Sequence, residues 1–535
     1  MNTLRLDGHN PHDVALAGEI LRSGGVVAIP TETVYGLAAS ALSESAALKV
    51  FTAKGRPADN PLIVHVADMA QLNAVWREVP PRAHALAEAF WPGPLSLILP
   101  RSGAIPDAVT GGLDTVGVRM PAHLVARAVI AAAGVPLAAP SANLSGKPSA
   151  TSAQHVLDDF DGRIDAVLDG GPCPVGVESS VVDLTGDIAT LLRPGAVLES
   201  DIAAILGAAR TAGPHAEADT GPASPGMKYP HYATKAPITL LSGAPEDTAR
   251  ALEGCASHPD SAILAFEEYL PRLQEIAPRL YNFGPSWDYE AHAQRLFGLL
   301  READRAGAGR IVIQAPRRHG RGAATWNRLW RAAGEQTVDC TARTIVGITG
   351  RSGAGKSVLA AHLTERGAVA LDADRIYAKL LAGDAAMQRA ILARFPEARA
   401  ADGGIDRRVL GSLAFGNPEA LAALSAITHP HVADAIRQRL AVLEHGVAVL
   451  DVPVLFGSGI DRLCTVTVGL LADDRGAAAR IMARDGIDAA AAARRIGAQQ
   501  SDDFFRRHCD IILENHGSRQ QLLDKADVLA DTLGM

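Results

Sequence analysis

The stretch "GITGRSGAGKS", residues 347–357, constrains the fold of this chain more than any other feature. It matches the spacing G-x-x-x-x-G-K-[ST] of a phosphate-binding loop, in which backbone N–H groups surround the phosphates. The run "TIVGIT" predicts a strand before the loop, and "VLAAHLTERG" predicts a helix after it, with the positive end of the helix facing the phosphates. This order predicts a parallel β-sheet flanked by helices.

The loop also assigns roles to single residues. Lys356 is expected to reach the β- and γ-phosphates of ATP, and Ser357 is expected to bind Mg²⁺. The residues expected to surround the nucleotide are Gly353, Ala354, Gly355, Lys356, Ser357 and Val358.

More than 340 residues precede this loop, so the chain must hold further domains. A length of 535 residues predicts roughly three or four domains of about 150 residues each. Alternating aliphatic runs and alanine-rich helical patterns favour an α/β multidomain protein. Pro- and Gly-rich composition predicts a linker at 207–236, and a second break lies near 333–344. The expected domains are therefore 1–206, 237–335 and 342–535, with 207–236 as linker.

Charge and cysteine content exclude some classes of protein. The net charge of −8 gives no whole-chain argument for nucleic-acid binding. A local basic face at "PRRHGRGAATWNRLWR" remains one interpretation, and a solvated loop and helix is the other. The five cysteines form no C-x-x-C pair, the N-terminus lacks an apolar signal core, and prolines interrupt the longest uncharged stretch. We therefore expect a cytoplasmic protein with reduced thiols and no membrane contact.

Three polar clusters mark the first 200 residues. They are "IPTETVYGL" with Thr31, Thr33 and Tyr35, "KGRPADNPLIVH" with Lys54, Arg56, Asn60 and His65, and "APSANLSGKPS" with Ser141, Asn143 and Ser145. Arg119 and Arg193 each follow a strand-like run. Cations combined with hydroxyl and amide donors suit a polyanionic substrate, whereas each cluster alone is also consistent with turn chemistry or a surface ion pair. The residues by themselves predict an anion-binding α/β domain.

The order of the motifs is more informative than any one of them. "PTETVYGL", "KGRPxxNPL", "WPGPLSLIL", "VGVRMP", "PSANLSGKPS" and "ESSVVDL…LLRPGAV" together resemble the threonylcarbamoyl-AMP synthase family, the Sua5/YrdC proteins, over roughly residues 10–200. "SPGMKYPHY" and the following α/β segment resemble the longer Sua5 branch. The resemblance implies a YrdC-like twisted sheet around a deep, positively charged cavity, followed by a small Rossmann-like domain. It also implies that L-threonine, bicarbonate and ATP give threonylcarbamoyl-adenylate and pyrophosphate, for modification of adenosine 37 in tRNA.

The same resemblance implies roles for residues. On the nucleotide side it places Lys54, Arg56, Asn60, Thr115, Ser141, Asn143, Ser149 and Arg193, with Lys54 and Arg56 as catalytic cations. On the threonine side it places Thr33, His65, Arg119 and Ser179. Tyr229 is expected to cover the nucleotide, or to anchor the linker by its apolar ring, with Lys228 and His231 nearby. Residues 237–335 show no catalytic constellation and are expected to support this cover.

The C-terminal segment offers two carboxylates, Asp372 and Asp374, after a second predicted strand. Either can accept a proton from an attacking hydroxyl or hold metal-bound water, and one of them can instead be a helix N-cap. "LDADRIYAKL", "ITHPHV", "DVPVLFGSGI", "RIMARDG", "RIGAQQ" and "CDIILENHGS" resemble dephospho-CoA kinase over 344–533. That resemblance implies transfer of the ATP γ-phosphate to the ribose 3′-hydroxyl of dephospho-CoA. Asp374 would be the base, Arg484 a lid arginine and Asp372 a water-mediated Mg²⁺ ligand.

Three departures from the second family leave an alternative open. Gly457 stands where a Glu is common, Val358 where Thr is frequent, and a glutamine is missing before "RGAAARIMARDG". A weak kinase or a regulatory nucleotide-binding domain therefore remains an alternative, as does an RNA-binding N-terminal domain. A carbamoyl-transfer maturation factor would need C-x-x-C pairs, which are absent.

The favoured hypothesis is a bifunctional transferase. Its expected cofactor is Mg²⁺ bound with ATP, with no tightly bound organic cofactor. Its expected partners are ATP, L-threonine, bicarbonate, dephospho-CoA and the tRNA threonylcarbamoyl-transferase machinery, and this chemistry does not require tRNA contact.

Overall fold

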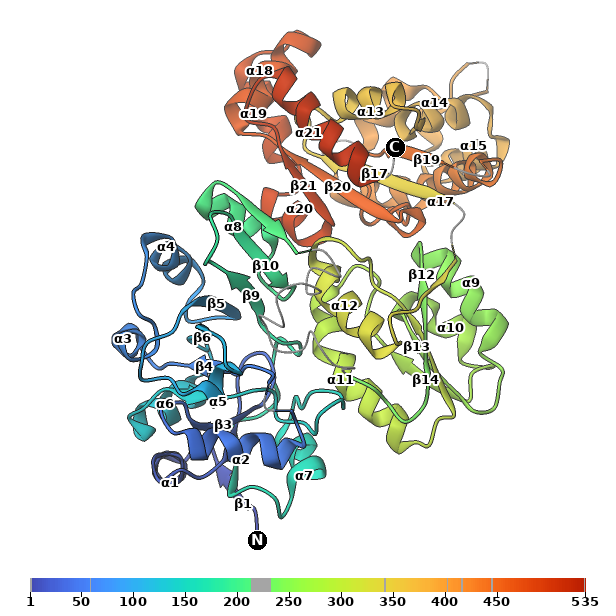
Figure 1. Ribbon diagram of the computed structural model, residues 1–535. Helices are drawn as coiled ribbons and strands as arrows, with labels where there is room; N and C mark the ends of the chain where they lie inside the picture. Colours follow the sequence, from blue (N-terminus) through green and yellow to red (C-terminus); the bar gives the residue numbers. More distant parts are fainter. Residues whose placement is uncertain are drawn as a thin grey trace. The chain divides into compact units, whose positions relative to one another are not determined.

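A computed structural model describes residues 2–57, 59–212, 232–340, 343–401, 403–414, 417–443, 446–533 and 535 (Figure 1). The chain divides into two compact units. One comprises Met1–Leu241 and Leu252–Val338, and the other comprises Ser242–Ala251 and Asp339–Met535. The first two of the three expected α/β segments therefore pack as one unit.

The first segment is built on an eleven-stranded mixed sheet with the order β1-β8-β2-β3-β7-β4-β6-β5-β9-β10-β11. The strands are β1 (Leu4–Asp7), β2 (Val27–Ile29), β3 (Gly36–Ser40), β4 (Ile63–His65), β5 (Leu95–Pro100), β6 (Thr115–Arg119), β7 (Leu137–Ala138), β8 (Ala166–Asp169), β9 (Ser180–Asp183), β10 (Ala189–Arg193) and β11 (Ala209–Thr211). Most of these strands are buried aliphatic runs, which explains why the sequence pattern predicted them.

Helices cover this sheet and close its cores. The longer ones are α1 (Pro11–Arg22), α2 (Glu44–Lys54), α4 (Pro81–Phe90), α6 (Leu124–Ala133), α7 (Ala153–Phe160) and α8 (Glu199–Leu206). Helix α1 begins where the Asn10 side chain accepts a hydrogen bond from the His12 N–H, and Pro11 occupies its first turn. Trp76 and Trp91 stack 6.1 Å apart within one apolar cluster. Buried packing thus fixes the positions of the strand ends.

The second segment is a five-stranded sheet with the order β14-β13-β15-β12-β16. Its strands are β12 (Ile238–Ser242), β13 (Ser261–Ala265), β14 (Arg279–Asn282), β15 (Arg310–Gln314) and β16 (Val338–Asp339), and its longer helices include α9 (Pro245–Cys255), α11 (Tyr289–Arg305) and α12 (Ala323–Ala332). The pairs β12–β15, β13–β14 and β13–β15 are parallel, as a Rossmann-like domain requires. Helices α11 and α12 lie together on one side of the sheet (Figure 1).

The third segment is a parallel sheet with the order β18-β19-β17-β20-β21. Its strands are β17 (Thr344–Gly350), β18 (Val369–Asp372), β19 (Val447–Asp451), β20 (Val466–Leu471) and β21 (Ile511–Glu514). Its longer helices are α13 (Lys356–Glu365), α14 (Ala373–Gly383), α15 (Ala385–Arg394), α16 (Arg407–Ala414), α17 (Pro418–Ala441), α18 (Asp474–Asp485), α19 (Ala489–Gly497), α20 (Asp502–His508) and α21 (Arg519–Thr532). The predicted P-loop fold, a parallel sheet flanked by helices, is confirmed.

Two predicted boundaries differ from the structure. The segment expected to be linker from residue 207 begins with β11, which pairs in parallel with β10 and extends the first sheet. The break expected near 333–344 contains β16, an edge strand of the second sheet. Both strands are short and carry no aliphatic run, so periodicity could not reveal them. Residues 213–231 lie outside the described part of the chain.

Among the residues that the structure describes, no helix combines the length and hydropathy that crossing a bilayer requires.

Candidate functional sites

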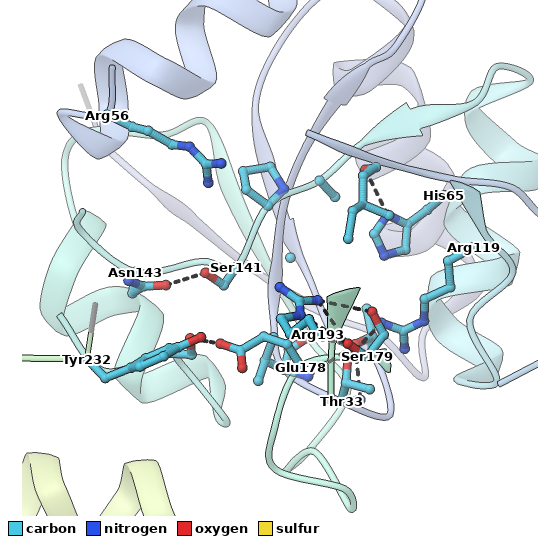
Figure 2. A pocket seen from close by; sticks show the side chains of 17 residues that line it. Thr33, Arg56, His65, Arg119, Ser141, Asn143, Glu178, Ser179, Arg193 and Tyr232 are labelled. Atoms are coloured by element: carbon cyan, nitrogen blue, oxygen red, sulfur yellow. Dashed lines mark hydrogen bonds between the residues drawn. The ribbon is translucent and has the colours of Figure 1, made fainter. Parts of the chain in front are cut away.

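A polar pocket opens in the first segment (Figure 2). Two of its walls are the parallel strands β4 and β6, whose last residues His65 and Arg119 are register partners. Parallel strands end at the same sheet edge, so this pairing brings both side chains to one place. The lining residues are Thr31, Thr33, Val34, Gly36, Arg56, Ile63, His65, Arg119, Ala139, Pro140, Ser141, Asn143, Ser149, Glu178, Ser179, Arg193 and Tyr232.

Arg119 organises one side of the pocket. Its Nη2 lies 2.5 Å from Glu32 Oε1, its Nη1 donates to Thr33 Oγ1 at 2.8 Å, and its Nε donates to Gly93 O at 3.2 Å. Burial and the neighbouring Arg119 lower the pKa of His65 to about 3, so its imidazole is neutral. This side combines a fixed cation with neutral polar groups, which suits a small zwitterion such as an amino acid.

Arg193 and Arg56 supply positive charge to the rest of the pocket. Arg193 Nε and Nη2 donate to Ser179 O at 3.1 and 3.0 Å, and Ser179 Oγ lies 2.8 Å from Ser96 Oγ. Burial and the neighbouring Arg193 lower the pKa of Arg56 to about 10, and burial and the neighbouring Arg328 lower the pKa of Arg193 to about 10. Guanidinium groups removed from water, buried at Arg193 and half-buried at Arg56, favour a bound anion.

Three polar residues of this pocket were not among the predicted substrate contacts, although Thr31 belongs to the first polar cluster of the sequence. Glu178 accepts a hydrogen bond from Ser149 Oγ at 2.6 Å, Thr31 lies 2.9 Å from Thr33 (Oγ1 to Oγ1), and Tyr232 reaches the pocket from beyond the undescribed segment (Figure 2). Burial and the nearby Glu178 raise the pKa of Tyr232 to about 12. Tyr232 also has φ 64°, a conformation that costs a non-glycine residue roughly 1–3 kcal/mol. Glu178 and Tyr232 belong to the motifs "ESSVVDL" and "SPGMKYPHY", from which only the neighbours Ser179 and Tyr229 were predicted to contact substrate.

The predicted residues of this site divide into three groups. The pocket brings together Thr33, Arg56, His65, Arg119, Ser141, Asn143, Ser149, Ser179 and Arg193. Lys54, Asn60 and Thr115 do not line it. Tyr229, Lys228 and His231 lie outside the described residues.

Lys54 differs from expectation for a clear reason. Its ammonium group is buried and donates to Asn143 O at 2.6 Å and to Ser141 O. Burial, together with the nearby Arg56, lowers its pKa well below the usual value. Lys54 therefore holds the turn that carries Ser141 and Asn143, whereas the family resemblance implied a place beside the nucleotide.

The phosphate-binding loop of the third segment lies between β17 and α13, as predicted. Lys356 Nζ donates to Gly350 O at 2.7 Å and to Arg351 O at 3.1 Å. Ser357 Oγ donates to Asp451 Oδ2 at 3.4 Å. Gly353, Gly350 and Gly355 all have positive φ, which lets the loop turn tightly around a ligand. The predicted residues from Gly353 to Val358 therefore form one continuous turn and helix start.

Asp372 and Asp451 end the neighbouring strands β18 and β19, and Asp374 lies in the first turn of α14. Asp372 caps helix α14 by accepting from the Arg375 N–H at 2.9 Å, which is the structural role left open for one of the predicted pair. Asp451, which was not predicted, is the register partner of Asp372. Burial and the neighbouring Asp372 raise the pKa of Asp374, and burial is also the largest factor that raises the pKa of Asp451. The strand "VAVLD" ending in a carboxylate was the available signal for Asp451.

A second pocket adjoins the loop. Asn515 Nδ2 donates to Ala354 O at 2.8 Å and so joins the segment after β21 to the loop. The lining residues are Gly355, Val358, Asp473, Gly476, Arg480, Asn515, His516, Gly517, Arg519 and Leu522. Its position beside the phosphate loop suits the base and ribose of a nucleotide.

Arg484, the predicted lid arginine, lies on α18 and forms two hydrogen bonds to the adjacent Asp485, at 2.7 and 2.8 Å. Arg495 from α19 donates to the same carboxylate at 2.6 Å. The structure therefore places Arg484 in an exposed local ion pair.

Gly457, where the second family commonly has Glu, has φ 83°. A Cβ atom there would meet nothing within 4 Å, so space is available, but L side chains rarely adopt this backbone conformation. The departure from the family pattern therefore coincides with a local loop conformation that favours glycine.

Family models match three consecutive stretches of the chain. Residues 19–195 match the model described as "Telomere recombination", and residues 197–334 match "Threonylcarbamoyl-AMP synthase, C-terminal domain". Residues 344–521 match "Dephospho-CoA kinase". The first and third matches fall within the first and third α/β segments, whereas the second begins at residue 197 and so includes α8 and β11 of the first segment.

Curated relatives match the first two segments. The threonylcarbamoyl-AMP synthase of Pyrococcus abyssi is 44% identical over 331 residues, which cover 61% of this chain and 95% of the relative. The enzyme of that name from Bacillus subtilis is 42% identical over 331 residues, covering 62% and 95%. The crystal structure of P. abyssi Sua5 complexed with L-threonine is 39% identical, with a TM-score of 0.59, and covers 63% of this chain and 99% of that structure.

Proposed function

Because this chain belongs to the threonylcarbamoyl-AMP synthase family and also carries a dephospho-CoA kinase domain, we propose that it uses ATP at two separate sites. The first site converts L-threonine, bicarbonate and ATP into threonylcarbamoyl-adenylate, pyrophosphate and water. The second transfers the γ-phosphate of ATP to the 3′-hydroxyl of dephospho-CoA.

The observation that supports the first activity is the set of buried guanidinium groups around one polar pocket. The threonine nitrogen must become a carbamate, and a carbamate oxygen must then attack the α-phosphorus of ATP while pyrophosphate leaves. Two anions have to approach each other in this step, and Arg56 and Arg193 at the pocket wall lower its barrier. Arg119, fixed by Glu32, is suited to hold the threonine carboxylate beside the Thr33 hydroxyl.

The activated product is a mixed anhydride that water destroys, so it suits prompt transfer to another molecule. We propose that the tRNA-modifying machinery consumes it, which requires no tRNA site on this chain.

The first activity is tested with the full chain, ATP, Mg²⁺, L-threonine and bicarbonate, by measuring threonylcarbamoyl-adenylate and pyrophosphate. Arg56→Ala should lower product formation by about 100-fold, because it removes a cation from the phosphate path. Exposed Arg163→Ala is the matched control and should match the parent. Pyrophosphate release that does not depend on threonine would contradict this assignment.

The second activity is supported by Lys356, Ser357 and the carboxylates at the same sheet edge. Lys356 can exchange its bonds to loop carbonyls for bonds to transferring phosphate oxygens. Asp374, whose pKa is raised by burial and by Asp372, can accept the proton of the attacking ribose hydroxyl.

Mg²⁺ fits the oxygen donors of this site. Ser357 Oγ and Asp451 Oδ2 are hard ligands 3.4 Å apart, and they would hold the ion, with Asp372 nearby through water. When bound, Mg²⁺ supplies positive charge to the β- and γ-phosphate oxygens.

This activity is tested by incubating the full chain with ATP, Mg²⁺ and dephospho-CoA and measuring CoA. Lys356→Ala should lower CoA formation by roughly 100- to 1,000-fold, and exposed Lys379→Ala should not change it. ATP binding without any CoA would instead favour a regulatory nucleotide-binding domain.

A further inference from the structure

The second α/β segment, residues 232–338, touches the walls of the first pocket at several points. Resting on the proposed synthase function, we propose that this segment is a working part of the nucleotide site, with Arg328 as a positioning residue for Glu178 and Ser149. The segment thereby fixes affinity for ATP, although none of its helices lines the pocket.

Arg328 is the most direct of these connections. It lies on α12, is buried, and its Nε donates to Glu178 Oε2 at 3.0 Å. Its Nη2 donates to Glu178 O at 3.3 Å, and its Nη1 donates to Pro194 O. The other carboxylate oxygen, Glu178 Oε1, accepts from Ser149 Oγ at 2.6 Å. One guanidinium group therefore holds both the side chain and the backbone of a pocket residue, and that residue orients the Ser149 hydroxyl.

The charge of Arg193 is attracted by the same carboxylate. Glu178 lies close to both arginines: burial opposes its ionisation, but Arg328 and then Arg193 lower its pKa to about 2. If Arg328 were removed, Glu178 would be left with Arg193 as its nearest buried cation. Arg193 would then be drawn from phosphate toward the carboxylate, and Ser149 would lose its fixed partner.

A second arginine holds the loop that leads to Ser149. Arg301 on α11 donates from Nη2 to Asp159 Oδ2 at 2.8 Å and to Pro148 O at 2.6 Å. Asp159 Oδ1 also pairs with Lys147 at 3.3 Å, and its Oδ2 accepts from the Leu144 N–H at 3.3 Å. These bonds fix the loop between Asn143 and Ser149, two residues that line the pocket.

Helix α11 makes two further contacts with this region. The ring of Phe297 stacks against Tyr232 with centroids 5.1 Å apart, and so supports the aromatic residue of the pocket. Gly176, two residues before Glu178, has φ 81°, and a Cβ atom there would lie 2.4 Å from Ala293 O. The chain before Glu178 thus lies directly against the helix backbone.

The threonine side is linked to the second segment less directly, through backbone: the Gly176 N–H, beside α11, donates to Thr33 O at 3.0 Å, and Ser179 follows Glu178 in the chain. Arg119 is fixed by Glu32, Thr33 and Gly93, all in the first segment. Loss of Arg328 should therefore weaken ATP binding much more than threonine binding, whereas a general loss of folding would affect both equally.

The test compares Arg328→Gln, Arg328→Lys and the control Arg295→Gln in a Lys356→Ala background, which silences the second ATP site. Arg295 lies on α11 and donates only within its own segment, to Asn282, so it matches the loss of an arginine without touching the pocket. Initial rates give KM for ATP and for threonine, calorimetry gives the Kd for ATP, and melting curves report folding.

We expect Arg328→Gln to raise KM and Kd for ATP by about tenfold or more, with KM for threonine within about twofold of the parent. Arg328→Lys should recover part of the affinity for ATP, because lysine restores the positive charge near Glu178 but not the several hydrogen bonds of the guanidinium group. Arg295→Gln should equal the parent.

An unchanged Kd for ATP in Arg328→Gln would overturn the proposal, as would equal losses for both substrates that follow the melting temperature. If the parent binds ATP but forms no adenylate, the proposed synthase function is wrong. The Kd for ATP of Arg328→Gln, compared with that of the parent, still decides the role of Arg328.

Discussion

The two proposed ATP sites hold their charged side chains in different ways. In the first pocket, Arg119 and Arg193 are buried at the ends of β6 and β10 and are bonded to Glu32 and Ser179, which lie outside those strands. In the phosphate-loop site, Lys356 is bonded to carbonyls of its own loop, and Arg484 is paired on the surface with the adjacent residue. The first arrangement is set by long-range packing, and the second is set by short local contacts.

This difference predicts how each site responds to ligand. Buried ion pairs are costly to break, so the first pocket should accept its nucleotide with little movement of its cations. Local contacts to carbonyls and to an exposed carboxylate are weak, so Lys356 and Arg484 can change partners when ATP binds. A preorganised pocket and an adjustable loop thus lie on one chain.

The largest effect should follow from breaking the buried pair of the first pocket. Arg119→Ala leaves the Glu32 carboxylate buried without its cation, and should lower the free energy of unfolding of the first unit by about 3–5 kcal/mol. Urea denaturation measures this loss. Arg119→Met together with Glu32→Leu, which removes both charges, should recover much of it. An Arg119→Ala protein as stable as the parent would contradict the contrast drawn here.

Loss of stability in acid should reveal a second buried charge of this pocket, the carboxylate of Glu178. The pKa of Glu178 is about 2, below its usual value of about 4.5, so its ionised form stabilises the fold above pH 4.5 and this stability is lost as the pH falls toward 2. The full effect is on the order of 3 kcal/mol. In urea titrations between pH 5 and 3, Glu178→Gln should show a shallower loss of stability than the parent. Parallel curves would mean that Glu178 is not held by Arg328 and Arg193.

A smaller loss should follow from a methyl group at the contact with α11. Gly176→Ala should lower the free energy of unfolding by about 2 kcal/mol or more, since it adds backbone strain and a clash with Ala293 O. Gly24→Ala is the matched control, because Gly24 has φ 80° but nothing within 4 Å of the added Cβ atom. The difference in free energy of unfolding between the two variants measures the contribution of this contact. Equal losses would show that Gly176 does not lie in close contact with α11.

The smallest effect belongs to the exposed pair of the second site. Arg484→Ala should change the free energy of unfolding by less than about 1 kcal/mol, because an exposed ion pair contributes little to stability. Differential scanning calorimetry resolves a change of that size. A loss as large as that of Arg119→Ala would remove the distinction between the two sites.

Prediction from sequence succeeded where a local pattern carries the structure. The phosphate loop, its strand and its helix follow directly from "TIVGITGRSGAGKS", because spacing and periodicity are local properties. Nine predicted residues of the first pocket gather around one space, and four of them, His65, Arg119, Ser179 and Arg193, lie at or next to strand ends. Asp372 shows the limit of such patterns, because a carboxylate after a strand can be a ligand or a cap.

Other features depend on contacts across long stretches of sequence. Lys54 donates hydrogen bonds to carbonyls of the 141–143 turn, and Arg328 donates to Glu178, which lies 150 residues earlier in the sequence. No local spacing marks either contact, because both arise only when two segments fold against each other. Tyr232 was missed for a related reason: three aromatic or cationic residues precede it in "KYPHY", and composition alone could not say which of them enters the pocket.

The contrast between the sites is tested most directly by crystal structures of the full chain with and without a non-hydrolysable ATP analogue. We predict that Glu178, Arg193 and Arg328 keep their bonds, with shifts below about 1 Å. We also predict that Lys356 Nζ leaves Gly350 O for phosphate oxygens. Separation of Arg328 from Glu178 on binding, with Lys356 still on its loop carbonyls, would contradict the account.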